Sequence, residues 1–207
     1  MEYTEENAVF SELGCAVIKN FVPKELLNAC CDYLEVIKND HLQKIDSKDP
    51  FPENDKFHPK TFSYYAPLCT EVVLTNSIGK IEKVTGDSVV PSFSYARTYY
   101  NGSELERHTD RNGANYGVSI CIDKDGNDWP LHIIDRDGTN HAVELDRGDA
   151  VVFCGMELEH WRNKFEGVFQ TQIFLFYVSE DLEQSNYFDG RSALGNPPAS
   201  HIKSRSK

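Results

Sequence analysis

The run S92-F-S-Y-A-R-T-Y-Y100 opens the part of the chain that decides the fold. Five more short runs typical of β-strands follow it: N115-Y-G-V-S-I-C-I-D123, L131-H-I-I-D135, H141-A-V-E-L145, D149-A-V-V-F153 and Q170-T-Q-I-F-L-F-Y-V178. Turn sequences separate the runs, among them N101-G-S103, K124-D-G-N-D128 and R136-D-G-T-N140. Short strands with this punctuation are typical of an all-β sandwich or barrel.

The sequence before residue 89 predicts mainly helices and a long polar segment. Residues 8–22 are expected to form a short strand region. A helix is expected over 23–37, because Pro23 suits a first helical turn and apolar residues recur at helical spacing after it. A second helix is expected over 70–84. The predicted fold class is therefore α+β and mainly β, with N-terminal helices packed on a C-terminal β-core.

The chain of 207 residues is long enough for one sizeable domain. We expect a helical and loop support region over 1–88, the β-core over 89–180 and a C-terminal extension over 181–207. The polar segment 38–67, with Tyr64 and Tyr65 near its end, is a candidate substrate lid; a merely solvated loop is the alternative.

Composition limits the classes of function. The charged fraction of 26% is ordinary for a soluble globular protein, and no signal peptide or membrane-spanning run is apparent, so we expect a cytoplasmic protein without a membrane partner. A net charge of -12 argues against a nucleic-acid partner, because phosphate contacts need Lys and Arg. The six cysteines form no CxxC pair, which argues against a thiolate zinc site.

One constellation of residues carries the chemistry. In L105-E-R-H-T-D110, His108 and Asp110 are two residues apart, so an extended backbone turns both side chains to the same face. A distal histidine, His160, follows the strand signal G148-D-A-V-V-F153. Two histidines and one carboxylate on one face of an octahedron form the facial triad of non-haem iron(II) oxygenases, which leaves open positions for a cosubstrate and dioxygen.

Residues of about 93–178 resemble the 2-oxoglutarate/iron(II)-dependent dioxygenase superfamily, in particular its prolyl 4-hydroxylase-like branch. The resemblance rests on Y99-Y-N-G-S-E-L-E-R-H-T-D-R111, W129-P-L131, G148-D-A-V-V-F153 and H160-W-R162 through V178. It implies a double-stranded β-helix (a jelly-roll, cupin-like core), Fe(II) held by His108, Asp110 and His160, and Tyr99 in the cosubstrate pocket. The implied reaction uses O2 to hydroxylate a C–H bond and decarboxylates 2-oxoglutarate to succinate, with ascorbate as an allowed reductant.

The chain departs from that family pattern in one place. The family usually has an Arg or Lys about ten residues after the distal histidine, where it binds the far carboxylate of 2-oxoglutarate; here Gln170 stands in that region. Because Arg97 and Tyr99 share a strand face, we hypothesise that Arg97 supplies the missing cation, with Gln170 or Gln172 as an auxiliary donor. The alternative is an Arg97 paired with a structural carboxylate.

Three further residues are candidates for substrate contacts: Arg111, which follows the HxD motif, Arg162, two residues after His160, and Trp129. For both arginines the alternatives are a surface salt bridge or, as for Arg111 beside Asp110, orientation of a metal ligand. For Trp129 the alternative is packing at the barrel mouth. The resemblance suggests a small-molecule, peptide or protein substrate, such as a prolyl or other amino-acid side chain. Competing functions are a cupin-like metal-dependent isomerase, a small-molecule binding protein and a pseudo-enzyme that keeps the barrel as an interaction module.

Overall fold

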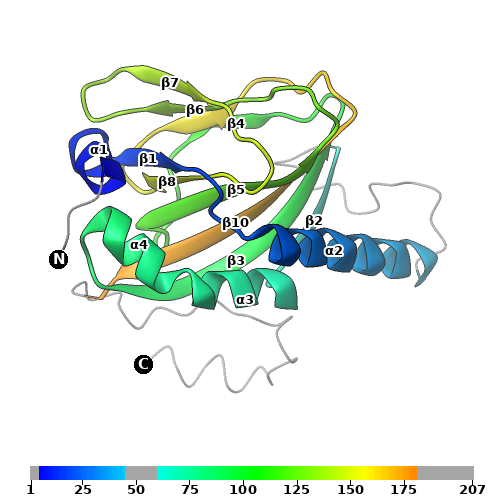
Figure 1. Cartoon of the computed structure of the whole chain (residues 1–207). Coiled ribbons are helices and arrows are strands. Elements are labelled where there is room, and N and C mark those ends of the chain that lie inside the picture. Colours follow the sequence, from blue (N-terminus) through cyan, green and yellow to red (C-terminus); the bar gives the residue numbers. More distant parts are fainter. Residues whose placement is uncertain (1–4, 45–59, 181–207) are drawn as a thin grey trace.

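The computed structural model describes residues 5–44 and 60–180. Ten strands in this part form two facing sheets, and four helices cover the larger sheet (Figure 1). The helices are α1 (Glu5–Leu13), α2 (Lys24–Lys44), α3 (Leu68–Asn76) and α4 (Ile78–Thr85). The strands are β1 (Cys15–Ile18), β2 (Thr61–Tyr65), β3 (Val89–Tyr100), β4 (Leu105–His108), β5 (Tyr116–Lys124), β6 (Leu131–Ile134), β7 (Asn140–Val143), β8 (Ala150–Cys154), β9 (His160–Arg162) and β10 (Phe169–Ser179).

The major sheet has six strands in the order β1-β8-β5-β10-β3-β2, and the minor sheet has four in the order β4-β9-β6-β7. All the pairings are antiparallel. The chain passes back and forth between the two sheets, which gives the double-stranded β-helix, or jelly roll, that the family resemblance implies. Two sheets that face each other enclose a core between their inner faces.

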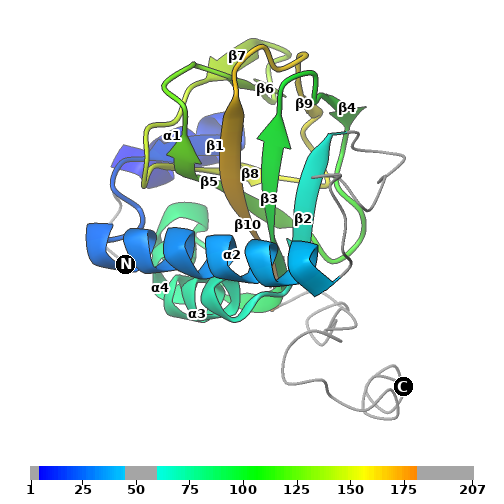
Figure 2. The same ribbon diagram turned by 90° about the vertical axis from the view of Figure 1, so that its right-hand side faces the viewer.

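The central part of the major sheet contains β10, whose run I173-F-L-F-Y-V178 is buried on both faces. Its inner face meets the minor sheet, and its outer face lies under helices. Figure 2 shows α2 running across the outer face of β10, β3 and β2. Leu27 and Cys30 of α2 are buried on the side of the helix that faces the sheet, in agreement with the predicted helical spacing. Helices packed on the β-core, as the sequence predicts, therefore support the barrel from outside.

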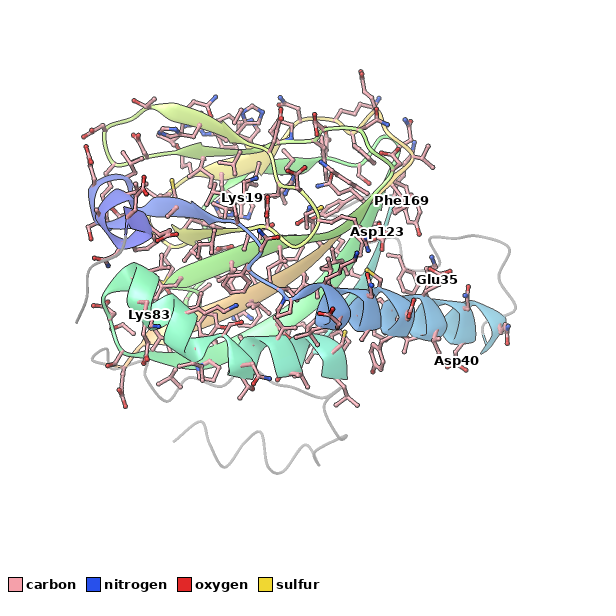
Figure 3. All side chains as sticks on the ribbon, in the orientation of Figure 1. Lys19, Glu35, Asp40, Lys83, Asp123 and Phe169 are labelled. Carbon is pink, nitrogen blue, oxygen red and sulfur yellow. The ribbon has the colours of Figure 1, made fainter. Side chains whose placement is uncertain are left out.

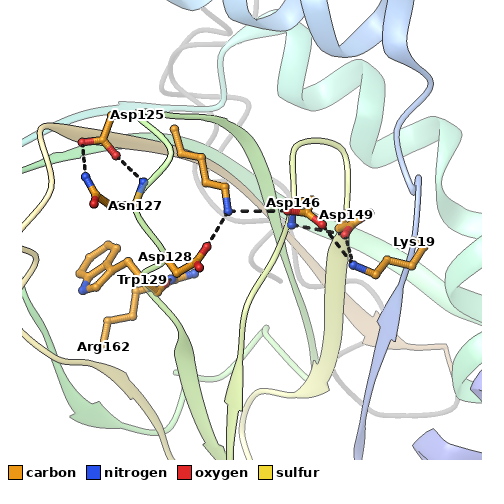
Figure 4. Close-up of polar contacts among 9 residues, drawn as sticks. Lys19, Asp125, Asn127, Asp128, Trp129, Asp146, Asp149 and Arg162 are labelled. Carbon is orange, nitrogen blue, oxygen red and sulfur yellow. Dashed lines mark hydrogen bonds and ion pairs between the residues drawn. The ribbon is translucent and has the colours of Figure 1, made fainter.

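Gly148 and Asp149, which directly precede β8, stabilise the turn at one rim of the barrel. Gly148 has a φ of 90°, a left-handed conformation that favours glycine. The carboxylate of the buried Asp149 accepts the backbone N–H of Asn20 at 3.0 Å. It also accepts the ammonium of Lys19 at 2.6 Å (Figure 4). This pair of contacts ties the start of β8 to the turn that follows β1.

The region before residue 89 differs from its prediction in three places. In the predicted strand region 8–22, the residues up to Leu13 belong to helix α1, and only Cys15–Ile18 is a strand. The predicted helix over 70–84 is two helices, because the chain bends at Ser77 between α3 and α4. The predicted helix over 23–37 is confirmed, but it continues to Lys44.

The polar segment 38–67 is therefore not one loop. Its first part belongs to α2, and Thr61–Tyr65 is the edge strand β2, which pairs with β3. Residues 45–59 lie outside the described residues, as does the C-terminal extension 181–207. The role of the segment as a lid stays a prediction. No helix in the described ranges is long and apolar enough to cross a membrane.

Candidate metal centre

The three predicted ligands converge where the minor sheet meets the loop after β4. His108 ends β4, His160 begins β9, and the two residues are paired directly across the strands. Asp110 follows β4 in the loop, where its backbone N–H donates to the carbonyl oxygen of Gly155 at 2.8 Å. One ligand atom from each of His108, Asp110 and His160 can be chosen so that all three lie within 4.8 Å of one another.

Both imidazoles are oriented by hydrogen bonds to the backbone. Nδ1 of His108 lies 2.7 Å from the carbonyl oxygen of Glu106, and Nδ1 of His160 lies 3.0 Å from that of Leu158. A carbonyl oxygen only accepts, so each Nδ1 carries the proton and each Nε2 presents a lone pair. The two Nε2 atoms lie 3.8 Å and 3.7 Å from Oδ1 of Asp110. Such supporting contacts to the backbone are typical of metal-binding histidines.

Burial sets the charge of this cluster. His160 is 4% exposed, and burial lowers its pKa to about 4, so the imidazole is neutral near pH 7. Burial raises the pKa of Asp110 to about 6, against the opposing effect of His108 and Arg111. Oδ2 of Asp110 is buried without a hydrogen-bond partner. A neutral imidazole beside a carboxylate with an unpaired oxygen fits a divalent cation better than it fits a structural ion pair.

The interior beside the triad contains the residues expected in a cosubstrate pocket. Tyr99 on β3 is fully buried, and its ring packs edge-on against Trp129 with centroids 4.9 Å apart. The register places Gln170 opposite Tyr99, and Gln172 opposite Arg97, on the adjacent strand β10. The predicted neighbourhood of the first and last core strands is thus confirmed, although the roles of these side chains remain predictions.

Arg97 shares the inner face with Tyr95 and Tyr99, as strand parity predicts. Its guanidinium carbon lies 5.2 Å and 5.7 Å from the centres of those two rings. Its Nε donates to Oγ of Ser63 on the edge strand β2 at 2.8 Å. The guanidinium therefore has a protein partner on the β2 side of β3.

The three candidates for substrate contacts lie in different places. Arg111 is exposed in the loop after β4, with its guanidinium carbon 4.2 Å from the ring centre of Phe93. Arg162 is 2% exposed and lies inside the barrel. Trp129 lies between Tyr99 and Phe165 and donates from Nε1 to the carbonyl oxygen of Asn163 at 2.6 Å. These contacts fit the packing alternative for Trp129, and its role in binding a substrate stays a prediction.

An aromatic cluster, which sequence reasoning missed, lines the inner face of the major sheet. Rings of β3 and β10 stack with centroids 4.3–5.7 Å apart, and they belong to Phe93, Tyr95, Phe174 and Phe176. Tyr95 lies close enough to Asp110 and Arg111 for their charges to influence its pKa, which burial raises. The alternation of aromatic residues in F93-S-Y95 and F174-L-F176 is the sequence pattern that could have revealed this aromatic cluster.

A separate cavity lies on the outer face of the major sheet, away from the triad. Its volume is about 420 Å³, and it lies between α2, which contributes Leu34, and the strands, which contribute Tyr64, Thr98 and Thr171. Figure 3 places Glu35 of α2 and Phe169 of β10, which also line it, on this side of the molecule. None of the three triad residues lines this cavity, so it is distinct from the candidate metal centre.

Comparison by sequence gives no match to a protein-family model or to a curated protein. Comparison of structures gives many matches. A prolyl-4-hydroxylase from Pseudomonas putida is 15% identical, with a TM-score of 0.61 over 83% of this chain and 96% of that one. HygX from Streptomyces hygroscopicus, solved with nickel, 2-oxoglutarate and hygromycin B, is 12% identical, with a TM-score of 0.61 over 86% of this chain and 88% of that one.

A third similar structure is SnoN from nogalamycin biosynthesis, a non-haem, α-ketoglutarate-dependent epimerase. It is 9% identical, with a TM-score of 0.63 over 84% of this chain and 80% of that one. At these identities the likeness concerns the fold. The chain therefore has the fold of the 2-oxoglutarate/iron(II)-dependent oxygenases, the one found in prolyl 4-hydroxylase.

Proposed function

We propose that this protein is an Fe(II)- and 2-oxoglutarate-dependent oxygenase in which His108, Asp110 and His160 hold the metal. The observation that carries the proposal is the orientation of the triad. Backbone carbonyls hold both Nδ1 atoms, so both Nε2 atoms face Oδ1 of Asp110. Prearranged ligands of this type form a facial triad, which leaves three positions for a chelating 2-oxo acid and dioxygen.

Iron bound there would supply the activation of dioxygen that couples decarboxylation of 2-oxoglutarate to succinate with oxidation of a substrate C–H bond. The protein contributes position and exclusion of water. His160 and Tyr99 are buried on the inner faces of the two sheets, while His108 is partly exposed at the rim. One side of the site is therefore closed by the core and the other is open to a substrate.

For the substrate we propose an amino-acid or peptide side chain, such as a prolyl ring, or a small molecule of similar size. The aromatic cluster supports this proposal, since Phe93, Tyr95 and Phe176 offer flat apolar surfaces close to the loop that carries Asp110. The neighbouring guanidinium of Arg111 would suit a carboxylate or a peptide carbonyl of the substrate.

The test begins without oxygen. Fe(II) and 2-oxoglutarate added to the anaerobic protein should give a weak visible charge-transfer band, and admission of air should produce succinate and CO2. The substitutions His160→Ala and Asp110→Ala should abolish both signals. His132→Ala is the matched control, because His132 lies on the neighbouring strand and stacks on Trp161, on the face opposite to His160. The absence of both the band and succinate in the unaltered protein would exclude the proposal.

Succinate formation also separates the alternatives. A cupin-like isomerase or a binding protein would bind metal without producing succinate. An epimerase that uses the same cosubstrate, as the name of SnoN indicates for that protein, would release succinate but leave the substrate mass unchanged. Hydroxylation adds one oxygen atom to the substrate, so mass spectrometry of the product separates these two reactions.

A further inference from the structure

Arg162 is a cation enclosed in the barrel beside the candidate metal centre. It lies two residues after His160 on β9, so both side chains point to the inner face of the minor sheet. Only 2% of Arg162 is exposed. Its guanidinium carbon lies 4.9 Å from the ring centre of Trp129, and Nη1 donates to the carbonyl oxygen of the same residue. Figure 4 shows the Arg162 side chain next to Trp129.

The other edge of this guanidinium has no hydrogen-bond partner. Nε and Nη2 of Arg162 are both buried and unpaired, and no carboxylate among the described residues forms an ion pair with it. An arginine guanidinium stays protonated in proteins, so Arg162 is a cation at neutral pH. The ionisable groups that act on it are Tyr99 and Cys121, and burial raises the pKa of the Cys121 thiol to about 11. A buried cation with a neutral surrounding is costly unless an anion binds it.

The unpaired atoms are those that a carboxylate needs. Nε and Nη2 lie on one edge of the planar guanidinium, where they can donate two parallel hydrogen bonds to the two oxygens of one carboxylate. Gln172 offers a third donor. It is fully buried, its Oε1 accepts from Oγ of Ser119 at 3.2 Å, and its Nε2 has no partner. Gln172 pairs across the strands with Cys121, which lies close to Arg162.

We propose that Arg162, assisted by Gln172, binds the distal carboxylate of 2-oxoglutarate. Gln170, at the position where the family usually has a cation, is neutral and cannot balance that charge. This inference rests on the proposed function. It assigns the binding of the distal carboxylate to Arg162 instead of Arg97. Arg97 already donates from Nε to Ser63, whereas the same edge of Arg162 is unpaired.

The spacing along β9 suits a five-carbon dicarboxylate. Two residues of a strand advance roughly 7 Å, which separates the metal ligand His160 from Arg162. The two carboxyl carbons of 2-oxoglutarate are joined by four carbon–carbon bonds of about 1.5 Å each, a contour of roughly 6 Å. A molecule that chelates the metal with its 2-oxo acid end can therefore place its other carboxylate at Arg162.

The test measures binding without turnover. Nickel-loaded protein is titrated by calorimetry with 2-oxoglutarate and with pyruvate, which has the 2-oxo acid end but no distal carboxylate. Arg162→Met should weaken the affinity for 2-oxoglutarate about 30-fold or more, because a charge-assisted pair of hydrogen bonds is lost. The affinities for pyruvate and nickel should change by less than about threefold. Arg97→Met, and Arg107→Met as an exposed control on the neighbouring strand β4, should change 2-oxoglutarate affinity by less than about threefold.

Thermal unfolding shows whether the variant is folded. Because Arg162 is buried without an anion, Arg162→Met should unfold at the same temperature as the unaltered apo-protein or higher. 2-Oxoglutarate should raise the midpoint of the nickel-loaded unaltered protein but not that of the variant. Three results would overturn the anchor role alone. They are an unchanged 2-oxoglutarate affinity in Arg162→Met, an equal loss of pyruvate affinity in that variant, and a larger loss of 2-oxoglutarate affinity in Arg97→Met. Unaltered nickel-loaded protein that binds no 2-oxoglutarate would overturn the proposed function as well.

Discussion

Gly155 and Asp110 occupy adjoining space at the candidate metal centre. The carbonyl oxygen of Gly155 accepts the backbone N–H of Asp110 at 2.8 Å. A Cβ atom added to Gly155 would lie 2.9 Å from the carbonyl oxygen of Ala114 and closer still to Oδ2 of Asp110. The φ angle of Gly155 is not positive, so the need for glycine here comes from the space that the Asp110 carboxylate fills.

The first prediction is that Gly155→Ala weakens metal binding. The added methyl group must push the Asp110 carboxylate away from the two Nε2 atoms, because the other neighbour is backbone and cannot yield easily. A metal site with one displaced ligand should lose roughly tenfold or more in affinity, similar to the loss of a supporting contact. Calorimetric titration with Ni(II) measures the effect. Equal affinity in the variant and the unaltered protein would show that the carboxylate moves without cost.

Gly79→Ala is a second prediction and the matched control. Gly79 is a residue inside α4, and an added Cβ would meet no atom within 4 Å. Alanine restricts the unfolded chain more than glycine does and suits a helix, so the free energy of unfolding should rise by about 0.5–1 kcal/mol. Urea denaturation measures the gain. Nickel affinity should stay as in the unaltered protein, and a decrease would mean that glycine substitutions disturb the site indirectly.

The triad could be predicted because its geometry follows from local rules. His108 and Asp110 are separated by one residue, and His160 follows a buried strand that returns the chain to the same rim. The short strands and turns predicted a β-sandwich or barrel, and the family resemblance implied the jelly roll in which β3 lies beside β10. These features depend on backbone periodicity, which the sequence carries directly.

The failed predictions concern segments whose state depends on distant partners. The short apolar pattern around Phe10 fits a strand or a helix, and packing against α4 decides in favour of α1, where the Asn7 side chain donates to the carbonyl oxygen of Val84 at 2.9 Å. Residues Thr61–Tyr65 form β2 because β3 offers an edge to pair with. Tertiary context overrides weak local preference in both cases.

The sequence alone could not decide between Arg162 and Arg97 as the residue that binds the distal carboxylate. Its parity with His160 places it on the inner face, but parity applies equally to Arg97 and Tyr99. Only the structure shows that Arg97 has Ser63 as a partner, whereas two nitrogens of Arg162 have none. Hydrogen-bond partners depend on side-chain conformation in three dimensions, and strand periodicity does not determine them.

A third prediction concerns the contact between β10 and α3. Tyr177 is fully buried, and its hydroxyl donates to the carbonyl oxygen of Leu74 at 2.7 Å. Tyr177→Phe removes the donor and leaves that carbonyl without it, so the free energy of unfolding should fall by about 1–2 kcal/mol. Urea denaturation with an unchanged slope would measure the loss. A change below about 0.3 kcal/mol would indicate that another donor, such as the nearby Ser77, compensates.

The last prediction concerns acid stability at the turn between β6 and β7. Oδ1 of Asp135 accepts the backbone N–H groups of Asp137 at 2.9 Å and Thr139 at 2.8 Å, and Oδ2 lies 2.6 Å from Nε2 of His141. These hydrogen bonds, with His141 first and Thr139 next, hold the pKa of Asp135 below its ordinary value. The carboxylate therefore stabilises the fold above the ordinary pKa of about 4, and this contribution is lost as the pH falls through the lower pKa of the folded protein.

Asp135→Asn should accordingly lower stability at pH 7, and its deficit relative to the unaltered protein should shrink at pH 3. Urea denaturation at both pH values measures the two differences. Asp137→Asn is the matched control, because Asp137 is an exposed carboxylate in the same turn. It should change stability little at either pH. A deficit of Asp135→Asn that is equal at pH 7 and pH 3 would mean that the turn depends on the shape of the side chain and not on its charge.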